Sequence, residues 1–217
     1  AAFTGAALHV ARPGRPPERV AAEVVTANYF GLLGPVIAQG RGFDADPDQG
    51  RGGATVVLSH RLWQRLFGGE GGPGETVAIN GLPHAVAGIA VRGFHGASRT
   101  GSADVWMPIG QHRVALPVYT GDVLTDRRNR PFFTMIGRLA PGAQVSEAAA
   151  QAEVVRAQLA RAFPEDRRLK TWRFDLQPGL EGRPWVREQL SRTMALLVGI
   201  VSVLLALTCA NLTGLVL

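Results

Sequence analysis

The chain has 217 residues and a formal net charge of +6, from 23 lysine and arginine residues against 17 aspartate and glutamate residues. Lysine occurs only at Lys170, and the arginines are scattered among acidic residues apart from the short group at 127, 128 and 130. Proteins that bind nucleic acid instead gather basic residues on one face, often with interleaved aromatic residues. The distribution therefore argues against nucleic acid as a partner.

Short apolar runs alternate with a few helical patterns over residues 1–192, which predicts a mixed α+β fold. The expected strands are 20–26, 54–58, 76–79, 85–89, 105–109, 132–139 and 171–176. The expected helices are 29–33, 60–67 and a longer one from a cap at Ser146 to about Phe163, with residues 110–131 as loop. These 192 residues are enough for one large domain or two small ones, each with a core.

Local signals fix several of these boundaries. Asn28 and Ser59 are residue types that cap helix N-termini, and each directly precedes a helical pattern. Asn80-Gly81 between two strand-like runs is a strong hairpin signal, since both residues tolerate positive φ.

The last segment differs from the rest of the chain. Residues 193–217 carry no charge, and about 20 mostly apolar residues are enough to span a bilayer as a helix. We therefore expect a transmembrane helix over 193–217. Because the chain begins with alanine and ends inside this run, we also expect it to be a fragment of a longer protein.

Small residues recur every fourth position in this apolar run, on one ridge of the expected helix. Such a ridge lets a second helix approach closely, and an adjacent asparagine can form a hydrogen bond across the contact. The predicted helix-packing residues are Ser202, Ala206, Ala210, Asn211 and Gly214.

No motif in the sequence supports catalysis or a cofactor. Gly69 to Gly74 has the glycine spacing of a dinucleotide fingerprint, but follows a helix pattern and precedes a strand, the reverse of the required order. The acidic residues Asp44, Asp46 and Asp48 resemble the start of a calcium loop that lacks its later glycine and glutamate. Cys209 is the only cysteine and lies in the apolar run, so the preceding domain can hold no disulfide.

The histidines do not indicate a metal site either. His9, His60, His84, His95 and His112 share no ligand spacing with one another or with acidic residues. We therefore expect them to be surface or packing residues.

Nine short motifs, in a fixed order, resemble those of one family of membrane proteins. The most distinctive is VVLSHRLWQRLFGG at 56–69. The others are VTANYFGLLG at 25–34, GRGF at 40–43, AING at 78–81, VAGI at 86–89, GFHG at 93–96, DVWMP at 104–108, GRLAPG at 137–142 and CANL at 209–212. Their order resembles the MacB-like periplasmic core domain of FtsX-like ABC transporter permeases, particularly the acidobacterial type, over roughly residues 20–217.

This resemblance implies a fold and a set of partners. The fold would be a porter-like α/β subdomain from the two ends, about 1–36 and 130–180, with a β-rich insertion at about 37–129, followed by the C-terminal transmembrane helix. The partners would be an ABC ATPase subunit, a second permease copy, a periplasmic adaptor and membrane lipid. The full protein would be a multi-pass protein of the bacterial inner membrane, with residues 1–192 in the periplasm.

The function implied by the resemblance is that of a non-catalytic permease subunit. Its extracytoplasmic domain would couple ATP-driven motion to substrate export or to work in the periplasm. One alternative is an FtsX-type scaffold that regulates an extracytoplasmic partner. Another is an enzyme with a single membrane anchor, which would need a catalytic constellation that the sequence does not offer.

The charges beside the apolar run point to the opposite topology. Arg183, Arg187 and Arg192 precede it closely, and positive charges near a membrane helix tend to remain in the cytoplasm. This rule is weak for long domains, so we follow the family resemblance and expect the domain to lie outside.

Overall fold

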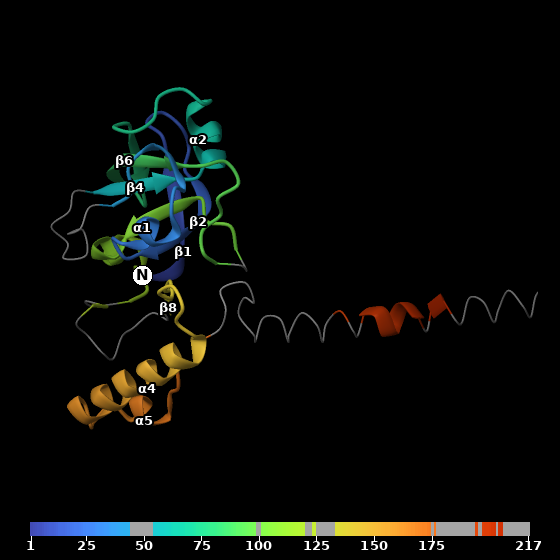
Figure 1. The fold of residues 1–217 in the computed structure, drawn as a ribbon. Coiled ribbons are helices and arrows are strands. Elements are labelled where there is room, and N and C mark those ends of the chain that lie inside the picture. Colours follow the sequence, from blue (N-terminus) through green and yellow to red (C-terminus); the bar gives the residue numbers. More distant parts are fainter. Residues whose placement is uncertain are drawn as a thin grey trace, which may run out of the picture. The chain divides into compact units, whose positions relative to one another are not determined.

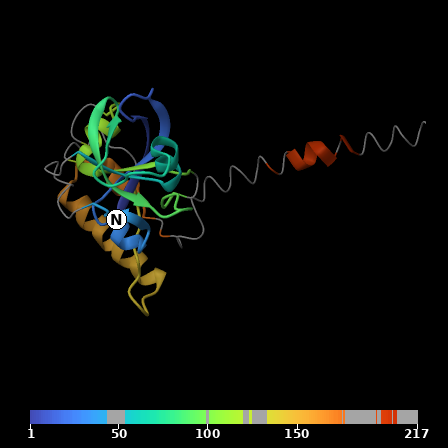
Figure 2. The same cartoon turned by 90° about the horizontal axis from the view of Figure 1, so that it is seen from above.

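The computed structural model describes residues 1–43, 54–98, 101–119, 123–124, 133–174, 176, 194, 197–202 and 204–205. The chain forms two compact units, Ala1–Ala143 and Gln144–Leu217. Figures 1 and 2 show the strands gathered in the first unit and helices α4 and α5 in the second.

Eight strands form the sheet of the first unit. They are β1 (Ala2–Ala11), β2 (Glu18–Val25), β3 (Ile37–Gly40), β4 (Thr55–Leu58), β5 (Thr76–Ile79), β6 (Leu82–Ala90), β7 (Val105–Pro108) and β8 (Thr134–Met135). Their order is β2-β7-β4-β6-β5-β1-β8, β3 pairs with β6, and β1 also pairs with β2. The β1–β2 pairing closes six strands into a hydrogen-bonded ring.

The ring mixes parallel and antiparallel pairs. β2–β7 and β4–β6 are parallel, whereas β1–β2, β1–β5, β4–β7 and β5–β6 are antiparallel. The β5–β6 turn has positive φ at Asn80 (48°) and Gly81 (84°), as a two-residue hairpin with the right twist requires. The predicted hairpin is thus confirmed.

Alternate residues on each strand point to opposite faces, so the ring has two cores. Val56 and Leu58 of β4 belong to the larger cluster, while Val57 between them belongs to the smaller one. On β7, Val105 and Met107 join the larger cluster, and Trp106 joins the smaller one.

Helix α2 (His60–Phe67) fills the larger cluster with Leu62, Trp63, Leu66 and Phe67. Ser59 caps this helix as predicted, because its Oγ accepts a hydrogen bond from the backbone N–H of Leu62 at 3.0 Å. A 3-10 turn, η2 (Ile109–Gln111), and the short helix α3 (His112–Ala115) add apolar side chains to the same cluster.

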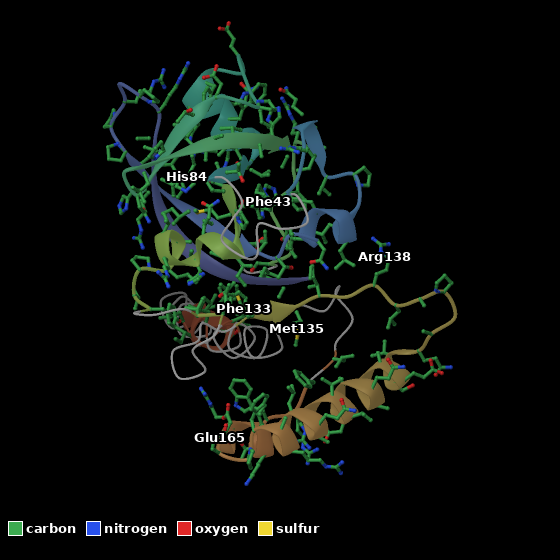
Figure 3. All side chains as sticks on the ribbon, turned by 90° about the vertical axis from the view of Figure 1, so that its left-hand side faces the viewer. Phe43, His84, Phe133, Met135, Arg138 and Glu165 are labelled. Atoms are coloured by element: carbon green, nitrogen blue, oxygen red, sulfur yellow. The ribbon has the colours of Figure 1, made fainter. Side chains whose placement is uncertain are left out.

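The smaller cluster lies beneath α1 (Tyr29–Leu33) and β3. Asn28 precedes α1 as predicted but makes no capping hydrogen bond with its side chain, which instead accepts one from Thr26 Oγ1 at 2.8 Å. Arg138 donates to the carbonyl of Leu32 at 2.8 Å, which ties the segment after β8 to α1, while Met135 of β8 is exposed (Figure 3).

The second unit contains α4 (Val145–Ala162) and α5 (Arg167–Thr171). Arg156 joins them, since its guanidinium pairs with Glu153 on α4 and donates to the carbonyl of Leu169 on α5 at 2.6 Å. None of the side chains of α4 is fully buried.

Four local predictions were wrong. α4 begins one residue before Ser146, because Gln144 and Glu147 form a capping box around the helix start. Of the strand expected at 132–139, the described residues 133–139 form only β8, which pairs with β1 at two positions. No strand forms at the described residues of the expected strand 171–176, because Thr171 ends helix α5, which Asp166 caps. In addition, η2 and α3 occupy part of the expected loop.

Two further strands were not foreseen. β1 and β3 contain many alanine and glycine residues, which carry little strand propensity, and both are set by pairing with neighbouring strands.

Truncating a side chain inside the ring should destabilise the domain strongly. Leu62 is fully buried, so L62A should lower the free energy of unfolding by about 2–5 kcal/mol through the cavity it leaves. The matched variant L82A removes the same atoms from a side chain that is 51% exposed. It should change the free energy of unfolding by less than about 1 kcal/mol. Urea unfolding in non-ionic detergent, followed by tryptophan fluorescence, measures both, and equal losses would contradict this assignment of the core.

Candidate functional site: a buried carboxylate and the segments it joins

Glu23 is a charged residue buried on the outer face of β2, with only 3% of its surface exposed. Its neighbours in sequence, Ala22 and Val24, point into the ring, so strand alternation directs Glu23 to the smaller cluster. Burying a carboxylate is costly unless hydrogen-bond donors surround it.

Three donors satisfy this carboxylate. Tyr29 donates its hydroxyl hydrogen to Oε2 at 2.6 Å, and the Trp106 indole N–H donates to the same oxygen at 2.9 Å. The backbone N–H of Ser98 donates to Oε1 at 3.2 Å. Because every contact is a donor to the carboxylate, the arrangement suits its ionised form.

The Tyr29 hydroxyl extends the network by one bond. It accepts a hydrogen bond from the backbone N–H of Ala97 at 2.7 Å. Burial, and next the negative charge of Glu23, raise the pKa of the Tyr29 phenol well above its ordinary value of 10.0. Tyr29 is therefore a lasting donor to Glu23 and cannot serve as a base at neutral pH.

Aromatic rings enclose this network. The Phe30 ring lies 5.5 Å from Phe43 and 6.0 Å from Trp106, and the Phe94 ring lies 5.1 Å from Trp106, all measured between centroids. Glycine is needed at 96, because its φ is +92° and a Cβ there would collide with the Glu23 carboxylate. The network and its aromatic shell thus join β2, α1, β7 and the segment 94–98.

A second buried acid, Asp104, directly precedes β7 and anchors α2. Its Oδ1 accepts a hydrogen bond from Ser59 Oγ at 2.8 Å. Arg61 forms a bidentate pair with it, from Nε to Oδ1 at 3.2 Å and from Nη2 to Oδ2 at 3.0 Å. The Arg65 guanidinium lies 3.6 Å from Asp104 Oδ2 and 3.4 Å from Glu18 Oε2. Ser59, Arg61 and Asp104 come from two of the motifs quoted above, 56–69 and 104–108.

The sequence motifs therefore meet in space. The motifs at 25–34, 40–43, 93–96 and 104–108 all contribute to the smaller cluster, although up to about 80 residues separate them. Sequence reasoning missed Glu23, which precedes the first motif. The available signal was a single acidic residue within the otherwise apolar run 20–25.

Most of the predicted helix-packing residues lie outside the part of the chain that the structure describes. Ser202 donates its hydroxyl to the carbonyl of Val198 at 2.8 Å, as a serine within a helix does. The other four, Ala206, Ala210, Asn211 and Gly214, fall outside the described residues, as do Asp44, Asp46, Asp48 and Cys209. Among the helical residues that are described, none forms a stretch long and apolar enough to cross a membrane.

The histidines are dispersed over the first unit. His84 and His112 are buried. Nδ1 of His84 lies 2.8 Å from the carbonyl oxygen of Leu82, and Nδ1 of His112 lies 3.1 Å from that of Ile109. Across the described parts of the chain, no group of three or more histidine, cysteine or acidic residues could hold a metal ion.

Comparison with known proteins identifies the family. A sequence model described as the MacB-like periplasmic core domain matches residues 1–155, well over half of the chain. The chain belongs to this family. None of the curated proteins compared with the chain matches it.

Comparison with solved structures identifies the fold. The periplasmic region of MacB from Actinobacillus actinomycetemcomitans is 17% identical, with a TM-score of 0.54, over 73% of this chain and 66% of that one. The extracellular domain of the noncanonic ABC-type transporter YknZ from Gram-positive bacteria is 18% identical, with a TM-score of 0.42, over 54% of this chain and 58% of that one. The chain thus spans less than two thirds of either structure, and the first of them shows that its mixed α/β fold is that of a MacB periplasmic domain.

Removing the Tyr29 hydroxyl should weaken this MacB-like domain without emptying its core. Y29F leaves Glu23 short of one donor, so the free energy of unfolding should fall by about 2 kcal/mol. The chain's other tyrosine, Tyr119, makes no side-chain hydrogen bond among the described residues, and Y119F should change this free energy by less than about 0.5 kcal/mol. Urea titrations of the unsubstituted chain, Y29F and Y119F measure the three free energies of unfolding.

The same pair of variants has a defined pH dependence. The pKa of Tyr29 is raised in the folded state. Its contribution to the free energy of unfolding is therefore complete below pH 10.0 and declines as the pH rises further. The stability advantage of the natural chain over Y29F should therefore narrow above about pH 10. An advantage that grows with alkaline pH would contradict the buried network.

Proposed function

We propose that this chain is the extracytoplasmic part of an ABC transporter permease, and that it couples ATP-driven motion to substrate export or to work in the periplasm. The observation that carries the proposal is the match of residues 1–155 to the MacB-like periplasmic core domain. The fold shared with the periplasmic region of MacB supports it.

The internal construction of the first unit suits a mechanical role. Densely packed cores deform little and transmit displacement. Here one closed ring carries apolar clusters on both faces, and Glu23 and Asp104 tie together segments that are remote in sequence. A force applied to one segment would therefore move the unit as a whole.

Membrane attachment through residues 193–217 is part of the proposal. These residues are uncharged, and those that the structure describes expose large apolar side chains, including Ile200 (57%), Val201 (61%) and Leu205 (64%). Lipid is a more favourable environment than water for such side chains. The domain would then project from the membrane into the periplasm.

The proposed partners follow from the same family assignment. They are an ABC ATPase on the cytoplasmic side, a second permease copy, membrane lipid and a periplasmic adaptor. The proposed division into porter-like ends, about 1–36 and 130–180, and an insertion, about 37–129, also rests on the family. In the structure β1 and β2 from the first of these ends share a sheet with β4 to β7.

Reporter fusions test the proposed location directly. Alkaline phosphatase or green fluorescent protein is fused after residue 130 of the full-length protein in a bacterial host. Phosphatase activity without fluorescence is expected, because phosphatase matures only outside the cytoplasm. Fluorescence without phosphatase activity would place the domain inside and would contradict the proposal.

The small-residue ridge gives a second test, concerning the proposed second permease copy. A210L or G214L should reduce self-association of residues 193–217 at least about fivefold in a membrane dimerisation assay, because a large side chain prevents close helix approach. Thr208 would lie roughly opposite Ala210 on a regular helix, so T208L is the matched control and should reduce association less than A210L. Unchanged association in all three variants would remove this ridge as a contact.

A further inference from the structure

Two arginines flank the tight turn between β1 and β2. Pro13 and Gly14 occupy the centre of this turn, Gly14 has a φ of +80°, and the N–H of Arg15 donates to the carbonyl of Arg12 at 3.0 Å. This combination fits a type II turn, in which the first and fourth residues lie within about 7 Å at their Cα atoms. Arg12 and Arg15 are therefore held close together on a rigid support.

Both guanidinium groups are also held in place by α2. Arg12 lies over the Phe67 ring, with Cζ 4.7 Å from its centroid, and its Nη1 is 3.5 Å from the carbonyl of Leu66. Arg15 donates from Nη1 to the carbonyl of Arg65 at 3.3 Å. The last carbonyls of a helix lack partners within it and form its negative end, which explains why both cations lie there.

Neither arginine has a carboxylate partner among the described residues. Two acids on this side of the unit, Asp104 and Glu18, pair instead with Arg61 and Arg65. A guanidinium has five N–H donors, and each of these two uses one of them in the contacts given above. The remaining donors are available to a ligand.

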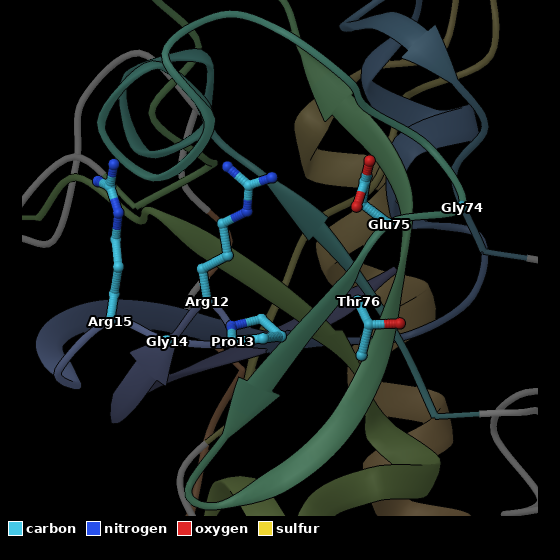
Figure 4. Close-up of a pocket in the computed structure, with 7 residues that line it drawn as sticks. All are labelled: Arg12, Pro13, Gly14, Arg15, Gly74, Glu75 and Thr76. Carbon is cyan, nitrogen blue, oxygen red and sulfur yellow. The ribbon is translucent and has the colours of Figure 1, made fainter.

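The turn forms one wall of a hollow of about 540 Å³ (Figure 4). Arg12, Pro13, Gly14 and Arg15 line this wall, and Gly74, Glu75 and Thr76 line the wall opposite. Figure 4 shows the two arginine side chains rising from the turn on the same side, with Glu75 across from them. Glu75 makes no ion pair with either arginine within the described residues.

We propose that this hollow binds a phosphate group, held between the guanidinium groups of Arg12 and Arg15. Guanidinium groups with free N–H donors match the geometry of phosphate oxygens. Glu75 repels an anion from the other wall, so it limits the affinity and favours a phosphate that carries fewer charges. The phosphate comes either from a soluble phosphate ester or from a phospholipid headgroup, and the inference does not depend on the proposed function.

Titration calorimetry of the 217-residue chain in non-ionic detergent and phosphate-free buffer tests the site. Inorganic phosphate represents the soluble source, and glycerophosphoglycerol, a phosphodiester, represents the lipid headgroup. R15Q should weaken binding of the preferred compound about tenfold, since it removes one charged donor. E75Q should strengthen that binding several-fold, because it removes the repulsive charge.

Two variants serve as matched controls. R19Q removes an arginine charge from exposed surface outside the hollow, and E70Q removes a glutamate charge in the same way; neither should change the affinity. R15Q is preferred to R12Q because Arg15 is exposed and lacks the aromatic contact that Arg12 makes with Phe67. Thermal unfolding of each variant shows that the fold is retained.

The results distinguish a phosphate site from general attraction of anions to a basic protein. Binding of either compound with opposite effects of R15Q and E75Q supports the site, and the preferred compound identifies the source of the phosphate. Equal weakening by R15Q and R19Q would show general attraction to a basic protein and would overturn the proposal. Binding of neither compound at millimolar concentration would overturn it as well.

Discussion

Pairing between β1 and β2 is the contact on which the rest of the first unit depends. It runs from Phe3 opposite Val25 to Val10 opposite Glu18, and it closes a ring that would otherwise be an open sheet with two free edges. Closure gives every strand an inner and an outer face. The inner face must be filled, which α2 and α3 accomplish, and the outer face must be covered, which requires α1 and the segment before β7.

The buried carboxylate of Glu23 makes the cover on the outer face specific. Apolar side chains alone would tolerate several arrangements of α1 and of residues 94–98, because apolar contacts have little directionality. A carboxylate accepts hydrogen bonds only from donors at defined positions, and Tyr29, Trp106 and the N–H of Ser98 supply them. Burial of apolar side chains permits several arrangements of this cover, and the hydrogen bonds to Glu23 select one of them.

These features explain why a chain only 17% identical to the MacB periplasmic region can have its fold. Core positions of a closed ring require apolar side chains of suitable volume rather than particular residues. The motifs that stand out in this sequence are the positions with stricter requirements, such as Gly96 against Glu23 and Asp104 beneath α2. They are places where glycine, aromatic rings or paired charges have no simple substitute.

Elements that local chemistry controls could be predicted from the sequence. Helix 60–67 with its Ser59 cap and the turn at Asn80-Gly81 were predictable, because a hydroxyl next to a helix start and two residues tolerant of positive φ act within a few residues. The family was also apparent from the order of its motifs. Long-range contacts, by contrast, select the strands that close the ring and make the β1 segment a strand. They also bring Glu23 to Trp106, 83 residues away. Those outcomes depend on partners remote in sequence, and no local pattern along the chain encodes the pairing of one strand with another.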